Sequence, residues 1–191
     1  SGVFQLESGG MRQMLTQLQP ASLEEITAAI ALYRPGPMDS IPTFIANKLD
    51  HRKITYKTPL LEPILKVTYG CIVYQEQVMS IFRTVAGYTY GHADIVRRAM
   101  SKKKDSAMQA EREDFINGSV ERGVDRRIAE EIFADMASFA KYAFNKAHAS
   151  AYAITTYRTA YLKRHYPGEY LAAMLTSVTG NIVKTSEYIA E

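Results

Sequence analysis

The sequence predicts a mainly α-helical fold, with at most one or two short strands near residues 71–74. Apolar residues recur at helical spacing along most of the chain, and prolines, glycines and capping residues divide it into helix-sized lengths. The 191 residues are 47% hydrophobic and 23% charged, which is ordinary usage for a globular protein with a core. No run of eighteen uncharged apolar residues occurs, so the sequence argues against a membrane span.

The first two helices and the loop after them have clear local signals. One face of the first expected helix is apolar, and Pro20 ends it. Ser22 and Glu25 have the spacing of a capping box, in which each side chain accepts from the other residue's backbone N–H. The second helix is expected to end near Tyr33. Residues 34–37 (RPGP) cannot be helical throughout, because both prolines lack an N–H and favour extended backbone before them.

The next expected elements alternate between regular and irregular structure. A short helix is expected over 42–48, where a proline can start it. Residues 49–70 are interrupted by prolines and a glycine and have no clear period. Residues 71–74 (CIVY) form the one convincing strand candidate. A helix is expected over 75–86, followed by a turn rich in tyrosine and glycine at 87–91.

The remainder of the chain is expected to be helical throughout, without an internal repeat or linker. Each helix there has a capping residue or an apolar stripe. The expected helices cover 93–100, Asp105 to Gly123, Asp125 to Phe139, the stretch that ends at His165, and the stretch that begins at Pro167. We therefore treat 1–191 as one fragment with no internal domain boundary.

Charge and cysteine content limit the class of protein further. The net charge is +3, so the distribution of charge matters more than its sum. Cys71 is the single cysteine, which excludes a disulfide framework within the chain and is typical of a reducing compartment such as the cytoplasm. The chain begins at Ser1 without an initiator methionine, and we expect it to be a segment of a longer protein.

The strongest charge feature is the segment 97–104 (RRAMSKKK), in which five of eight residues are cationic and none is acidic. Arg97 and Arg98 offer forked donors suited to phosphate. The lysines Lys102, Lys103 and Lys104 add point charges in a line, as a polyanion requires. The alternative is a solvated helix end whose cations complement the helix dipole.

A second candidate segment covers residues 141–150 (KYAFNKAHAS). Tyr142 and Phe144 have faces that can stack on a base or sugar. Asn145, Lys146 and His148 are donors suited to phosphate oxygens at a helix start. The alternative, which spacing alone favours slightly, is a loop with aromatic side chains in the core and a solvated lysine.

Arg34 is held by the Pro-Gly-Pro sequence after it and is a further candidate phosphate ligand. A buried arginine that donates to loop carbonyls is an equally good interpretation. The tyrosines Tyr152, Tyr157 and Tyr161 are expected to be packing residues rather than a stacking series.

Several catalytic classes have no support in the sequence. Two-metal phosphoryl transfer requires clustered carboxylates, and no such cluster can be built from these residues. The four histidines and Cys71 lack metal-ligand spacing, and Glu76 is expected to hold neighbouring loops together rather than to catalyse. The residues alone therefore predict a helical domain with two cationic segments for a phosphate-rich ligand, and no catalytic centre of its own.

Long ordered motifs spread over nearly the whole chain resemble those of C-family DNA polymerases, the alpha subunits of bacterial replicative DNA polymerase III. The motifs are GVFQLES at 2–8, YRPGP at 33–37, YG at 69–70, VYQEQVM at 73–79, GY at 87–88, AD at 93–94, RRAM at 97–100, KKK at 102–104, FNK at 144–146, His148, AYA at 151–153 and AYLK at 160–163.

The resemblance implies the fingers region of such a polymerase, a DNA-directed nucleotidyltransferase. The palm, absent here, would supply carboxylates for two Mg²⁺ ions, and the isolated fragment is expected to be inactive and not to bind Mg²⁺ alone. Implied partners are primer–template DNA, the incoming dNTP, the other polymerase domains, and replisome subunits such as the sliding clamp through regions outside this segment. A non-catalytic nucleic-acid-binding or assembly module of similar fold is the alternative.

Carried over motif by motif, the resemblance assigns most candidate residues to the nucleotide. The triphosphate contacts would be Arg97 and Arg98, followed by Asn145, Lys146 and His148. Tyr142 and Phe144 would lie near the nascent base pair, and Lys102 to Lys104 would touch the DNA backbone. The chain has Ser101 and Ala143 where the family has glycine, and Ala147 where it has serine. Alanine would be strained at Ala143 if the loop required a positive φ.

Overall fold

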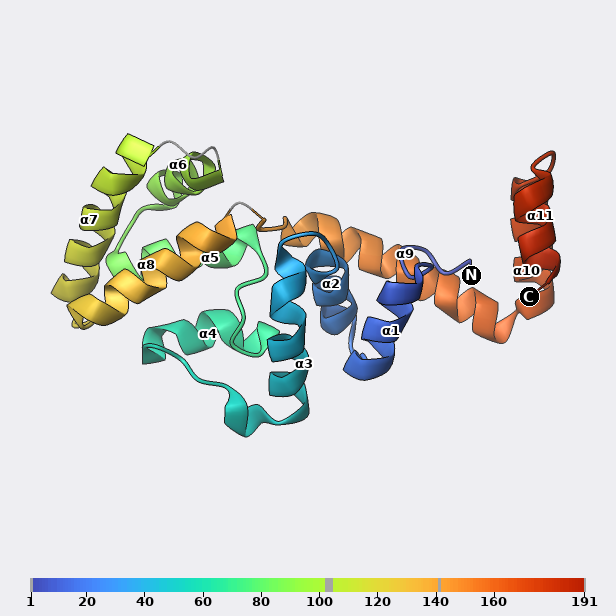
Figure 1. Ribbon diagram of the computed structural model, residues 1–191, viewed down its shortest axis with the longest axis horizontal. Helices are drawn as coiled ribbons and strands as arrows, with labels where there is room; N and C mark the ends of the chain where they lie inside the picture. Colours follow the sequence, from blue (N-terminus) through green and yellow to red (C-terminus); the bar gives the residue numbers. More distant parts are fainter. Residues whose placement is uncertain (1, 102–104, 141, 191) are drawn as a thin grey trace. The chain divides into compact units, whose positions relative to one another are not determined.

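The computed structural model describes residues 2–101, 105–140 and 142–190 and is helical over most of them (Figure 1). The chain divides into two compact units, one of Ser1–Ile30 with Ala147–Glu191 and the other of Ala31–Lys146. We describe each unit separately. The mainly α-helical class is confirmed, whereas the treatment of 1–191 as a single domain stays a prediction.

The first unit joins both ends of the chain. It contains α1 (Gly9–Leu18), most of α2 (Leu23–Leu32) and α9 (Lys146–His165), α10 (Pro167–Ser177) and α11 (Ile182–Ile189). The N-terminal segment lies against α9, because Thr156 Oγ1 donates to the Phe4 carbonyl at 3.0 Å and Phe4 N–H donates to Thr159 Oγ1 at 3.1 Å. The buried face of α9 consists of small residues, Ala149, Ala153 and Thr156.

The second unit contains α3 (Ile41–Leu49), α4 (Glu62–Leu65), α5 (Gln75–Ala86), α6 (Tyr90–Ser101), α7 (Asp105–Glu121) and α8 (Arg126–Ala140). α5 packs against α6 and α7, and α7 packs against α8. Three phenylalanines meet in the core between these helices. The ring centroid of Phe82 lies 5.3 Å from that of Phe115, with the rings edge to face, and 6.4 Å from that of Phe133.

Several sequence expectations about helix ends are confirmed. α10 begins at Pro167, and α7 is followed by Gly123 with a positive φ of 82°. The Asp125 side chain caps α8 by accepting from the backbone of Arg127 at 2.9 Å. The capping-box expectation was half right. Ser22 accepts from the Glu25 N–H at 3.3 Å, but the Glu25 carboxylate accepts from the Ala21 N–H instead.

The strand expected over 71–74 was wrong. Within the described residues this segment is extended and makes only an isolated parallel bridge, between Tyr74 and Phe144. No second extended segment continues alongside it there, so the apolar residues pack against helices. The irregular stretch 49–70 contains short 3-10 turns and α4, and α11 was not anticipated.

The described helices include none that is both long enough and apolar enough to cross a bilayer.

Candidate functional site

Arg97 and Arg98 lie toward the end of α6, and both bind the same carboxylate. Asp94 Oδ1 accepts from the Arg97 guanidinium at 2.8 Å, and Asp94 Oδ2 lies 2.6 Å from the Arg98 guanidinium. These are i,i+3 and i,i+4 pairs, which share one helix face. The hydrogen bond from Arg97, with that from Arg98 adding to it, lowers the pKa of the Asp94 carboxyl. Both arginines are thus oriented by one anionic group.

The two arginines differ in exposure, which the sequence could not show. The Arg97 side chain is 16% exposed, and the Arg98 side chain is 67% exposed. Arg98 is therefore the more accessible of the two guanidinium groups. The lysines Lys102, Lys103 and Lys104 lie outside the described residues.

Contacts with α7 and with α5 hold the start of α6 in place. The Tyr88 and His92 rings stack in parallel with centroids 4.4 Å apart, and His92 Nε2 lies 3.1 Å from a Glu111 carboxylate oxygen on α7. Burial, and then the charge of Glu111, raises the pKa of the Tyr88 hydroxyl, so that hydroxyl remains a donor to Glu111 at neutral pH. On the α5 side, the Arg83 guanidinium lies 3.9 Å from the centroid of the Tyr90 ring.

Residues 142–145 of the second candidate segment form a loop before α9 that runs alongside residues 73–76, and residues 146–150 are the first residues of α9. Gln75 N–H donates to the Phe144 carbonyl at 2.9 Å, and Phe144 N–H donates to the Val73 carbonyl at 3.4 Å. The Gln75 side-chain amide donates to the Ala143 carbonyl at 2.9 Å. Among the described residues with side chains, positive φ occurs at Gln5, Gln19 and Tyr69, so Ala143 is accommodated without that strain.

Arg34 fixes the other side of this loop. Its guanidinium donates to the Tyr142 carbonyl at 2.8 Å and to the Ala31 carbonyl at 3.2 Å, and it lies 4.0 Å from the centroid of the Phe144 ring. Burial lowers the pKa of Arg34. These contacts match the interpretation of Arg34 as a residue that satisfies loop carbonyls.

Gly36, just after Arg34, is required by the same packing. Its φ is +102°, and a Cβ built there would lie 2.4 Å from the Tyr142 ring. The Arg-Pro-Gly-Pro sequence therefore shapes the backbone and leaves room for an aromatic ring from far along the chain.

The last part of the loop is held by Glu76 in the first turn of α5. Its carboxylate accepts from the Asn145 side-chain amide at 2.8 Å and from the Lys146 backbone N–H at 3.1 and 3.0 Å. The Lys146 ammonium lies 5.5 Å from the centroid of the Tyr74 ring. The sequence-based role of Glu76, to hold neighbouring loops together, agrees with these contacts.

The structure therefore brings together Arg34, Tyr142, Phe144, Asn145 and Lys146 around one loop, and it carries Arg97 and Arg98 on α6 of the same unit.

His148 lies in the other unit, where its ring centroid is 4.2 Å from that of Tyr152. Tyr152 packs on Phe4, as expected for a packing residue. Tyr157 and Tyr161, in contrast, are 54% and 44% exposed, so the expectation that they pack is not met within this unit.

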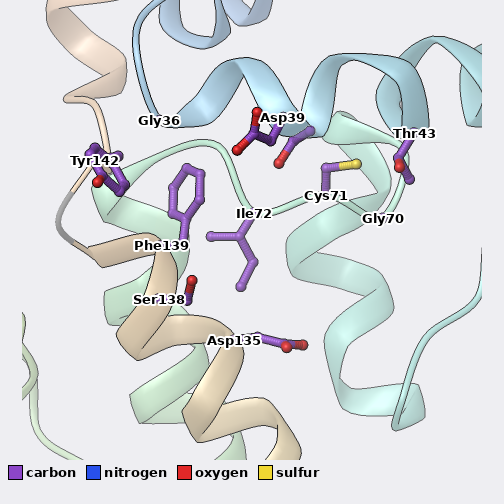
Figure 2. Close-up of a pocket in the computed structure, with 11 residues that line it drawn as sticks. Gly36, Asp39, Thr43, Gly70, Cys71, Ile72, Asp135, Ser138, Phe139 and Tyr142 are labelled. Carbon is purple, nitrogen blue, oxygen red and sulfur yellow. The ribbon is translucent and has the colours of Figure 1, made fainter.

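A pocket of about 460 Å³ lies beside this loop in the second unit (Figure 2). It is lined by Asp39 from the turn before α3, Cys71 from the extended segment, and Asp135 and Phe139 from α8. Asp135 forms an ion pair with Lys57 at 2.7 Å. Sequence reasoning missed this pocket because its walls come from three distant segments. Its carboxylates disfavour a phosphate ligand, so we do not place the triphosphate there.

Comparison with known proteins identifies the family. Residues 1–123 match the sequence profile of the family described as "Bacterial DNA polymerase III alpha subunit finger domain". The chain belongs to this family. It is 49% identical over 191 residues to the DNA polymerase III subunit alpha of Borreliella burgdorferi, 51% over 190 residues to that of Chlamydia trachomatis, and 47% over 191 residues to that of Staphylococcus aureus.

These relatives are much longer than the chain. The chain is covered completely in each comparison, but it spans only 17%, 15% and 18% of the three relatives. Within the described part of this finger domain, no three His, Cys, Asp or Glu side chains are grouped so that they could hold a metal ion.

Proposed function

We propose that this chain is the fingers region of a bacterial DNA-templated DNA polymerase, and that it binds the triphosphate of the incoming dNTP and covers the nascent base pair. One observation carries the proposal. In a finger domain, two neighbouring arginines are oriented by a single carboxylate on α6, and one of them is largely exposed.

The mechanism is electrostatic. Arg98 binds triphosphate oxygens with its forked donors. Arg97 and Asp94, which lie on the same helix face, keep the Arg98 side chain oriented. The triphosphate carries more negative charge than Asp94 and competes with it for the Arg98 guanidinium. The helix that carries Arg98 is already in place, so on binding only the Arg98 side chain exchanges Asp94 for the triphosphate, and this contact aligns the α-phosphate for in-line attack.

The loop 142–146 supplies the second part of the proposed site. Phe144 and Tyr142 lie near the nascent base pair, and Asn145 and Lys146 contact the nucleotide; His148 is a further candidate contact to the nucleotide. Arg34 acts here through the loop, because its guanidinium donates to loop carbonyls. We assign Lys102 to Lys104 to the DNA backbone of the primer–template.

The polymerase palm, outside this chain, would hold two Mg²⁺ ions on carboxylates, and these ions would assist attack of the primer hydroxyl on the α-phosphate with release of pyrophosphate. The part played by this chain is to bind, orient and cover the nucleotide. Other polymerase domains, primer–template DNA and replisome subunits such as the sliding clamp would be partners of the whole cytoplasmic enzyme.

Single-nucleotide incorporation by the full-length polymerase tests this proposal. Arg98→Ala is expected to raise the KM for the dNTP about tenfold or more, the factor for losing a charge-assisted hydrogen bond, and to leave the Kd for primer–template unchanged. Arg127→Ala is the matched control, because Arg127 is an exposed arginine paired i,i+4 with Glu131 on α8. An unchanged KM and rate for Arg98→Ala would refute the proposal.

A further inference from the structure

The negatively charged carboxylate of Glu76 lies at Lys146, the first residue of α9. The helix α5 begins at Gln75, directly after the Tyr74–Phe144 bridge, so the side chain of the second helical residue projects toward the end of the loop. Both carboxylate oxygens lie within 3.1 Å of the Lys146 N–H, the first amide of α9. The third contact is the Asn145 side-chain amide at 2.8 Å.

This arrangement determines which donors remain for a phosphate. A helix N-terminus carries a partial positive charge and unpaired N–H groups, which makes it a general anion site. At the Lys146 N–H a protein carboxylate already occupies this position. This N–H therefore serves to hold the loop, and the loop offers its side chains to a nucleotide.

The same carboxylate determines how the Asn145 amide is turned. An ionised carboxylate only accepts hydrogen bonds, so the amide nitrogen of Asn145 must face Glu76 and its carbonyl oxygen must face the opposite way. Lys146 follows directly, and its backbone N–H is tied to the same group. One side chain thus sets the orientation of both residues.

We propose that Glu76 is a positioning residue for nucleotide binding: it turns the Asn145 amide and fixes the first residue of α9, so that Asn145 and Lys146 meet the incoming nucleotide in one geometry. This inference rests on the proposed function, because it assigns Glu76 a role through residues of that site. Glu76 itself does not touch the nucleotide.

The test is pre-steady-state incorporation by the full-length polymerase carrying Glu76→Ala, Glu76→Asp or Glu76→Gln. Glu76→Ala removes every acceptor, and Glu76→Asp keeps the charge but shortens the reach by one methylene. Glu76→Gln keeps one oxygen for the Lys146 N–H. Asn145→Ala and Lys146→Ala are measured in parallel, and Glu169→Ala is the control, because Glu169 is an exposed acidic residue in the first turn of α10.

The expected result is a selective rise in the KM for the dNTP. Glu76→Ala and Glu76→Asp raise it about tenfold, Glu76→Gln raises it less, and the Kd for primer–template and the melting temperature of Glu76→Gln stay at wild-type values. Asn145→Ala and Lys146→Ala raise the same KM, and adding Glu76→Gln to Asn145→Ala raises it less than the product of the single effects.

Three results would overturn the inference, and they differ. If Asn145→Ala and Lys146→Ala raise the KM but the Glu76 variants do not, Glu76 has no positioning role and the proposed function stands. If none of these variants changes the KM, the loop does not bind nucleotide, and the inference fails together with that part of the proposed function. A drop in melting temperature with an unchanged KM would make Glu76 a structural cap only.

Discussion

At the scale of single residues, the Asp94 carboxylate binds two arginines that differ in their exposure to solvent. Exposed ion pairs contribute little to stability, so the main effect of this ion-pair cluster is to orient the two arginine side chains. The Arg97 side chain is half-buried, and the Arg98 side chain exposes its charged guanidinium to solvent. The sequence RRAM predicted a phosphate-binding pair, but exposure depends on the helix face turned toward α5 and α7, which a basic run does not encode.

Cys71 gives a pH-dependent prediction at the same scale. Burial raises the pKa of its thiol to about 11, so the reactive thiolate is scarce at neutral pH. At pH 8 the thiolate fraction should be about a hundredfold below that of a thiol whose pKa is two units lower.

Iodoacetamide labelling of the chain, followed by intact mass, measures this reactivity directly because Cys71 is the only cysteine. The rate should rise about tenfold per pH unit up to the pKa. Unfolding in urea should raise the rate at pH 8 toward that of a free thiol. Rapid labelling of the folded chain at pH 7 would contradict the burial described here.

Arg34 marks the limit of residue-level prediction. The sequence left a phosphate ligand and a loop-binding arginine as equal alternatives. The structure shows donation to the carbonyl of Tyr142, which is 108 residues away. Local sequence cannot indicate an acceptor at that distance, although the Pro-Gly-Pro sequence did indicate a shaped loop.

At the scale of elements, helices were predictable because their signals are local. Asp125 caps α8 and Pro167 is the first residue of α10, so each of these signals lies at the start of the helix that it predicts. The strand over 71–74 was wrong because β structure requires a partner strand. The only bridge found in the described residues involves Phe144, which a run of apolar residues cannot reveal. The sequence predicted that Glu76 holds neighbouring loops together, but it did not predict which groups Glu76 contacts.

The packing of α5 against α7 gives an element-scale prediction. A Cβ added at Gly118 would lie 2.4 Å from the Ala86 carbonyl oxygen. That neighbour is backbone and cannot turn aside, so the two helices must separate. Gly118→Ala should therefore lower the free energy of unfolding by about 1–3 kcal/mol, although alanine is the better helix former.

Urea unfolding followed by circular dichroism provides the measurement. Gly168→Ala in α10 is the matched control, because a Cβ there meets no atom within 4 Å. It should leave stability unchanged or raise it by up to about 1 kcal/mol. Equal stability of the two variants would show that α5 and α7 do not approach as closely as described.

At the scale of the whole molecule, our proposal assigns cations and hydrogen-bond donors to this chain and the metal-binding carboxylates to other parts of the polymerase. Its net charge is only +3, yet the candidate nucleotide ligands gather on α6 and on the loop before α9. The chain spans 15–18% of the length of these relatives, and we propose that the rest of the polymerase supplies carboxylates and further DNA contacts. The family resemblance implied this division between fingers and palm, and the lack of a carboxylate cluster in the sequence agrees with it.

The most direct test of that account is equilibrium binding of the matching dNTP to the full-length polymerase on a primer that ends in a dideoxynucleotide. This primer blocks chemistry, so the titration reports nucleotide binding alone. We expect Arg98→Ala to weaken the Kd for the dNTP about tenfold or more, with no change in the Kd for primer–template. A Kd for the dNTP equal to that of the wild type would contradict the central claim that α6 binds the triphosphate.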